Sequence, residues 1–165
     1  MGFAKSGIVG DAFLPKMIEQ CSDDQERGMV YILYYTGMHG SVLRNLSLDN
    51  LKVEGESTYL RWTRTKTNKR MEAPLPQNRL PIIRQFLIGK KPGFRWMNIL
   101  LKDIGERAGY EGVSTMTFRH TRTLRLIQEG VPLPMIAEVM GCTGDVITRN
   151  YAKLTETQKR NEVSR

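Results

Sequence analysis

The spacing of hydrophobic residues divides the chain into two kinds of segment. Over most of its length apolar residues recur every three or four positions, which predicts amphipathic helices. Segments with this helical spacing are 12–21, 23–36, 38–46, 78–88, 94–108, 116–128 and 131–140. In 94–108 the spacing runs through Trp96, Ile99, Leu100 and Ile104. The helix that starts beside Asp23 is apolar on most sides, which predicts that it is buried.

Residues 48–75 change to a period of two, which is typical of half-buried strands. The apolar residues that alternate with polar neighbours here are Leu51, Val53, Leu60, Trp62, Ala73 and Leu75. Turn residues separate these runs at 55–56 and 67–68, so we expect three antiparallel strands. The sequence therefore predicts a mainly α fold with a small three-stranded antiparallel sheet.

The length and hydrophobic content fit one domain with a real core. The chain has 165 residues, of which 40% are hydrophobic, and that is too little for two comfortable domains. Residues 1–11 are small and mixed, typical of a linker remnant. We expect the domain to span 12–154 and a polar tail to span 155–165, where a short docking helix is the alternative to a frayed end.

The charge balance points to a polyanionic partner. The formal net charge is +8 and the isoelectric point is about 9.7, which favours nucleic acid as the partner. The two cysteines, Cys21 and Cys142, form no C-x-x-C pair, so we expect free thiols and no zinc-type metal site. No signal-peptide pattern or membrane-spanning apolar run is visible, which favours a cytoplasmic protein.

Two segments carry a resemblance to a known family. Residues 116–122 read MTFRHTR, and residues 141–151 lead through a short polar turn to Tyr151. This arrangement resembles the C-terminal catalytic domain of tyrosine recombinases, the phage integrase family. The family pattern is His-x-x-Arg-His-Thr, a helix, Gly-His, and about nine residues to the nucleophilic tyrosine. The resemblance covers nearly all of the chain and implies the same helical architecture.

The resemblance also implies an activity. Such enzymes cleave and rejoin DNA by two transesterifications through a 3′-phosphotyrosyl link, and they use no metal or nucleotide cofactor. They usually act on double-stranded DNA as tetramers, with a further N-terminal domain that clamps the DNA. We therefore expect a catalytic half of a longer protein, at the nucleoid of a prokaryote or in a viral system.

Three residues match the family at catalytic positions. Tyr151 is the expected nucleophile, and because its free pKa is about 10 it needs help to attack at neutral pH. Arg119 is the expected phosphate ligand, since its planar fork suits two oxygens. Lys66 lies eight residues before Pro74 in a predicted hairpin, where the family places the acid that protonates the leaving 5′-oxygen.

Three other positions depart from the family. His39 replaces the first catalytic arginine, and its imidazole is only partly charged at neutral pH. Met116 replaces the first histidine and cannot move a proton. Cys142 replaces the second, and a neutral thiol is a weak donor. Arg44, five residues after His39, lies about 140° round a helix from it and is a poor substitute.

Other cations are expected to grip the DNA backbone. These are Arg64, Lys69 and Arg70 in the hairpin and Arg122 in the helix over 116–128.

We favour a recombinase with a weakened active site. A catalytically degenerate DNA-binding module is the alternative, because the first arginine and both histidines are missing. A third reading is a basic regulator with a helix-turn-helix built from 131–141 and the segment after it, with Tyr151 as a packing residue.

Overall fold

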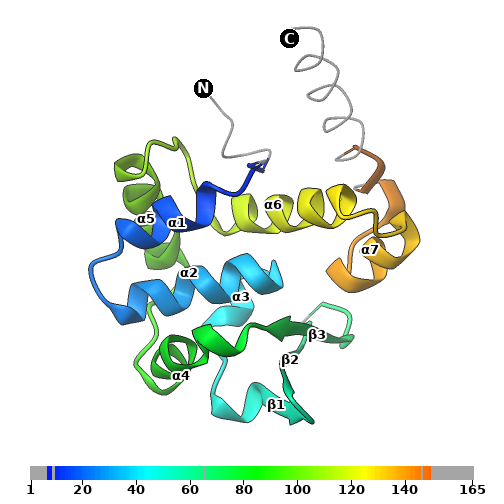
Figure 1. Ribbon diagram of the computed structural model, residues 1–165, viewed down its shortest axis with the longest axis horizontal. Helices are drawn as coiled ribbons and strands as arrows, with labels where there is room; N and C mark the ends of the chain where they lie inside the picture. Colours follow the sequence, from blue (N-terminus) through cyan, green and yellow to red (C-terminus); the bar gives the residue numbers. More distant parts are fainter. Residues whose placement is uncertain (1–6, 9, 65, 146, 150–165) are drawn as a thin grey trace, which may run out of the picture.

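The computed structural model describes residues 7–8, 10–64, 66–145 and 147–149, and they form a helical domain with one sheet (Figure 1). This confirms the predicted fold class. The elements are α1 (Phe13–Glu19), α2 (Asp24–Thr36), α3 (Gly40–Leu43), η2 (Leu48–Asn50), β1 (Leu51–Glu54), β2 (Ser57–Thr63), β3 (Arg70–Leu75), η3 (Gln77–Arg79), α4 (Leu80–Ile88), α5 (Phe94–Arg107), α6 (Thr115–Gln128) and α7 (Leu133–Met140). Tyr151, the 155–165 tail and most of the 1–11 linker lie outside the described residues.

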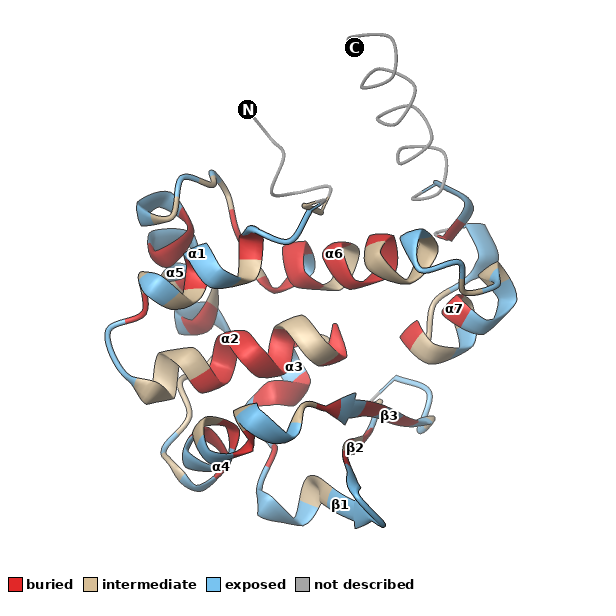
Figure 2. Cartoon of the chain, in the orientation of Figure 1, coloured by how far each residue is buried: buried red, intermediate tan, exposed pale blue. Residues whose placement is uncertain are grey.

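The core is built around α2, as its apolar character predicts. The Asp23 carboxylate caps the helix by accepting from the Glu26 N–H at 2.8 Å, and Gly37 ends it in a left-handed conformation. The middle of the helix, Met29 to Leu33, is fully buried. Figure 2 shows the buried residues concentrated in α2 and α6, which pack on one another.

The sheet has the order β1-β2-β3 with both pairs antiparallel. Leu60 and Trp62 of β2 and Met71, Ala73 and Leu75 of β3 turn one face to the core. The predicted turns are present, with positive φ at Gly55 and Asn68. β1 differs from the prediction: Val53 is 65% exposed, because this edge strand extends beyond the core.

Two helices differ from their predicted limits or faces. The short helix expected over 38–46 is reduced to α3, Gly40–Leu43. The buried side of α5 consists of Met97, Leu101 and Ile104. Trp96 is 56% and Ile99 46% exposed. The apolar spacing alone did not reveal that the buried stripe of α5 begins at Met97.

A second, smaller core lies at the far end of α6. It contains Ile136 and Met140 of α7 together with Ile147, all buried, and partly buried Leu126 and Ile127 of α6 cover it. This cluster fixes α7, and the residues after it, to the end of α6. In the described part of the chain, no helix has the length and apolar character needed to cross a membrane.

Candidate active site

Three arginines of α6 donate to the carbonyl end of α2. Arg119 Nη1 donates to the Gly37 oxygen at 2.9 Å, and Arg125 Nη2 donates to the Tyr34 oxygen at 3.1 Å. Between them, Arg122 Nη1 donates to the Thr36 oxygen at 2.6 Å. α2 has no basic residue in its own last turn. The positive charge that favours a helix C-terminus is therefore supplied by α6.

Arg119 also reaches the end of α7. Its Nη2 donates to the Met140 oxygen at 2.5 Å, so one guanidinium joins the C-terminal ends of α2 and α7. Burial lowers its pKa, Cys142 opposes that change, and Arg64 adds to it. The two carbonyls account for two of its five N–H donors. Arg119 is thus held in place by the backbone at the point where α7 ends.

Arg122 is not available to DNA, contrary to the prediction. Its side chain is only 5% exposed and lies against the end of α2, where Nη1 is also 3.8 Å from the Met140 sulfur. Burial lowers its pKa to about 10, and Arg125 and Arg119 add to that effect. A guanidinium covered in this way supports the fold and offers no contact to a phosphate.

His39 lines a cavity of about 220 Å³ with Ser41, Val42, Arg64 and Lys66. Burial lowers the pKa of His39 to about 4, and Arg119, Arg64 and Lys66 lower it in the same direction. The imidazole is therefore neutral at pH 7, not partly charged as the sequence suggested. Its Nε2 is buried and has no hydrogen-bond partner among the described residues. The residue predicted to replace the family's first arginine is therefore uncharged at pH 7.

Cys142 and Met116, the other two positions predicted to depart from the family pattern, are placed differently. Cys142 follows Gly141, the left-handed cap of α7, and its N–H donates to the Ala137 oxygen at 3.1 Å. Burial raises the pKa of Cys142, against the lowering effect of Arg119 and Arg64, so it is a neutral thiol at pH 7. Met116 is 43% exposed in the first turn of α6. Cys142 thus belongs to the charged cluster electrostatically, whereas Met116 adds no polar group.

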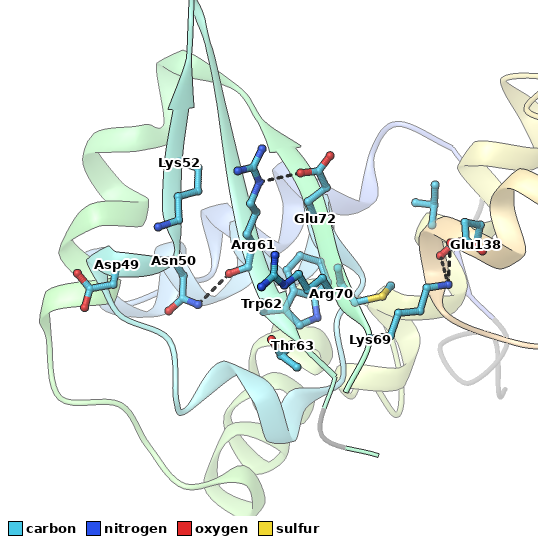
Figure 3. Close-up of a pocket in the computed structure, with 12 residues that line it drawn as sticks. Asp49, Asn50, Lys52, Arg61, Trp62, Thr63, Lys69, Arg70, Glu72 and Glu138 are labelled. Atoms are coloured by element: carbon cyan, nitrogen blue, oxygen red, sulfur yellow. Dashed lines mark hydrogen bonds and ion pairs between the residues drawn. The ribbon is translucent and has the colours of Figure 1, made fainter. Parts of the chain in front are cut away.

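The connection between β2 and β3 rests on α7. Lys69 Nζ lies 3.0 Å from Glu138 Oε1 and 3.4 Å from the Glu138 backbone oxygen (Figure 3). The Arg64 N–H donates to the Lys69 oxygen at 2.9 Å and closes the hairpin. The chain segment that carries Lys66 is therefore tied to the helix that precedes Cys142. Sequence reasoning missed Glu138, because nothing in the sequence pairs it with Lys69.

A larger cavity of about 730 Å³ lies between the sheet and α7. Figure 3 shows basic residues along it, among them Lys52, Arg61, Lys69 and Arg70. Arg61 is occupied, since it pairs with Glu72 at 2.8 Å and with Glu54. Arg70 is exposed and has no ion-pair partner among the described residues. Among those residues, no three His, Cys, Asp or Glu side chains are placed to hold a metal ion.

Two contacts hold the segment that follows α7. Ile147 is buried in the second core, and Thr148 Oγ1 donates to the Gly144 oxygen at 2.9 Å. Tyr151 itself lies outside the described residues. The structure thus brings His39, Arg64, Lys66, Arg119 and Cys142 into one electrostatic cluster.

Comparisons with known proteins agree with this fold. Tyrosine recombinase XerA of Pyrococcus furiosus is 24% identical over 169 residues, which cover 91% of this chain and 58% of that protein. The chain therefore spans a little over half the length of this curated relative.

Two solved structures share the fold. The post-cleavage complex of XerH recombinase with a palindromic difH substrate has a TM-score of 0.76 at 17% identity, covering 96% of this chain and 53% of that chain. The catalytic domain of bacteriophage HP1 integrase has a TM-score of 0.66 at 20% identity, covering 90% of this chain and 88% of that chain. The model of the phage integrase family matches residues 11–158, and the chain belongs to that family.

Proposed function

We propose that this chain is the catalytic part of a site-specific DNA recombinase that cleaves and rejoins DNA through a 3′-phosphotyrosyl intermediate. The observation that carries the proposal is the cluster of Arg64, Lys66 and Arg119 around neutral His39. Three cations near one small cavity can stabilise the negative charge that builds on a phosphodiester during phosphoryl transfer. The unit that performs the reaction corresponds to residues 12–154.

The chemistry needs a nucleophile, a charge clamp and an acid. The Tyr151 oxygen attacks the scissile phosphorus and passes its proton to water, while the bond to the 5′-oxygen breaks and Lys66 gives that oxygen a proton. Arg119 stabilises the negative charge on the non-bridging oxygens. The 5′-hydroxyl of a partner strand then attacks the phosphotyrosine and gives its proton to the neutral Lys66. Tyr151 takes a proton back from water as it leaves.

The substituted positions weaken this site. His39 is neutral, the Cys142 thiol is a weak donor and Met116 offers no proton. Each lost phosphate donor costs on the order of a hundredfold in rate. We infer a slow enzyme, or one that depends on other cations in the same cavity.

Double-stranded DNA is the proposed partner. Exposed Arg70 and half-exposed Lys69 lie on the hairpin, where their side chains can contact the DNA backbone. The XerH structure is that of a recombinase bound to its difH substrate. We further propose that the protein acts as a tetramer on paired sites at the nucleoid of a prokaryotic cell.

A non-catalytic DNA-binding module is the second candidate. The observation in its favour is the neutral His39 where the family has an arginine. Backbone contacts by lysine and arginine supply much of the affinity for DNA, so binding would survive the loss of catalysis.

Covalent trapping separates the two candidates. The full-length protein is incubated with a nicked duplex selected from a random library, and a protein–DNA adduct is sought on a denaturing gel. An adduct that disappears in Tyr151→Phe supports the recombinase. An adduct seen only with His39→Arg means a scaffold disabled at that position. Binding without an adduct from either version supports the non-catalytic module.

A further inference from the structure

We propose that Arg64 supplies the guanidinium missing at position 39, as a catalytic residue that binds the non-bridging oxygens of the scissile phosphate. The inference rests on the proposed recombinase function and extends it. The sequence suggested only a general backbone contact for Arg64. The structure places it in the same cavity as His39.

Arg64 and His39 line the cavity from different elements. His39 precedes α3, and Arg64 follows β2, two residues before Lys66; all three line the same space of about 220 Å³. The Arg64 backbone is fixed by the hydrogen bond from its N–H to the Lys69 oxygen at 2.9 Å. Arg64 therefore approaches the cavity beside the proposed general acid.

The guanidinium of Arg64 also reaches the end of α7. A Cβ on Gly141 would lie 3.1 Å from Arg64 Nη1, so the guanidinium lies close against the Gly141 backbone. Gly141 stands between Met140, whose carbonyl holds Arg119, and Cys142. Arg64 thus spans the distance from His39 to the residues that hold Arg119.

The charge of Arg64 is not used by another group. Among the described residues, its side chain has no hydrogen-bond or ion-pair partner, whereas Arg61 has two carboxylates and Arg119 two carbonyls. None of the described residues that line the cavity carries a carboxylate. An arginine held beside an acid-free cavity is ready to bind an anion with its planar fork.

Arg44 does not compete for this role. It caps the C-terminal end of α3, is exposed, and does not line the cavity. It is therefore a matched control: Arg44→Ala removes the same charge and the same side chain close in sequence to His39.

The reaction itself is unchanged by this assignment. The bond between the Tyr151 oxygen and phosphorus forms as the Tyr151 proton passes to water, the bond to the 5′-oxygen breaks, and Lys66 supplies the proton to the leaving oxygen. Arg64 and Arg119 stay protonated throughout and stabilise the charge that builds on the two non-bridging oxygens.

The first test is charge rescue in cleavage. Adduct formation is measured for the full-length protein, Arg64→Ala and Arg44→Ala on nicked DNA with either a normal or a neutral methylphosphonate linkage at the cleavage site. We expect Arg64→Ala to be on the order of a hundredfold slower on phosphate, and within about threefold of the unchanged protein on methylphosphonate, which needs one cation fewer. Misfolding cannot produce such a selective rescue, because one preparation is used on both DNAs.

A second arm restores the charge at the family position. His39→Arg added to Arg64→Ala should recover most of the lost rate, since either side chain then supplies the second guanidinium. Equal rates for Arg64→Ala and Arg44→Ala would overturn the proposal. So would an Arg64→Ala loss of the same size on both linkages.

A binding arm keeps the proposal testable if no adduct forms. In a Tyr151→Phe background, affinity is compared for duplexes with a methylphosphonate at each phosphate in turn. A methylphosphonate at one position should weaken binding about tenfold relative to the normal phosphate. Arg64→Ala should abolish this preference for the charged phosphate, and Arg44→Ala should keep it. If Arg64→Ala leaves this preference unchanged, the assignment is overturned. If Arg64→Ala abolishes the preference but the cleavage test gives no adduct, only the recombinase function is contradicted.

Discussion

The guanidinium of Arg122 donates to the carbonyl oxygen of Thr36 across 2.6 Å, and both residues are buried. This bond is the middle of three by which α6 satisfies the last carbonyls of α2. Because Arg119 belongs to the same set, its proposed role in catalysis and its role in stability are linked. A loss of activity at Arg119 must therefore be interpreted together with the free energy of unfolding.

Arg122→Met should lower the free energy of unfolding by about 3 kcal/mol, because the Thr36 carbonyl stays buried without its donor. Urea denaturation followed by circular dichroism measures the change. Arg84→Met is the control, since Arg84 is exposed on α4, and it should change stability by less than about 0.5 kcal/mol. Equal effects of the two substitutions would show that the Thr36 bond does not stabilise the fold.

Gly141→Ala should destabilise the protein more than Gly130→Ala. Both glycines have positive φ, +64° and +80°, so both substitutions carry the left-handed penalty of about 1 kcal/mol. Only at Gly141 would the new Cβ meet other atoms, Arg64 Nη1 and Met71 Cε, each at 3.1 Å; at Gly130 nothing lies within 4 Å. The difference between the two unfolding free energies isolates the contact with the hairpin. If the two substitutions lower the unfolding free energy equally, the hairpin side chains move away from the new Cβ without a measurable loss of stability.

Much of the fold follows from local rules. The Asp23 cap, the glycine end of α2 and the turns at Gly55 and Asn68 each depend on neighbours in sequence, and all are present. The face of α5 was missed because its buried stripe depends on which other helices it meets. Periodicity shows that a helix has a buried stripe, but it does not show at which residue the stripe starts.

The site was less accessible to sequence reasoning. Arg122 is a basic residue in a basic protein, and only the orphan carbonyls of α2 explain why it is buried. The lowered pKa of His39 depends first on its burial and then on Arg119, Arg64 and Lys66, which approach from other elements. One signal was present: Arg64 and Lys66 are only two residues apart in the sequence.

His39 should make stability fall as the pH drops from about 6.5 to about 4. The pKa of His39 is lowered from 6.5 to about 4 by burial and by the nearby cations. In this window the unfolded chain binds a proton that the folded chain does not, so acid favours unfolding. His39→Gln should reduce the slope of unfolding free energy against pH by up to one proton there, and leave it unchanged above about 7. Ser41→Ala, in the same cavity without a titrating group, should keep the full slope; an identical slope in His39→Gln would contradict the shift.

Glu138→Gln should loosen the hairpin with little effect on global stability. The Lys69–Glu138 pair is exposed, with side chains 35% and 73% accessible, so its loss costs about 1 kcal/mol or less. Asp103→Asn is the control, because it removes an ion pair to Arg107 of similar exposure on α5. Hydrogen exchange of the Arg64 amide, which is bonded to the Lys69 oxygen, should speed up in Glu138→Gln alone.

The same substitution tests whether hairpin placement limits the reaction. Since Lys66 and Arg64 both belong to this hairpin, Glu138→Gln should slow adduct formation more than Asp103→Asn when the two variants are equally stable. High salt should reduce the difference, because it screens the Lys69–Glu138 attraction in the unchanged protein. Faster exchange at Arg64 with an unchanged rate of adduct formation would mean that DNA, and not Glu138, sets the hairpin in its working position.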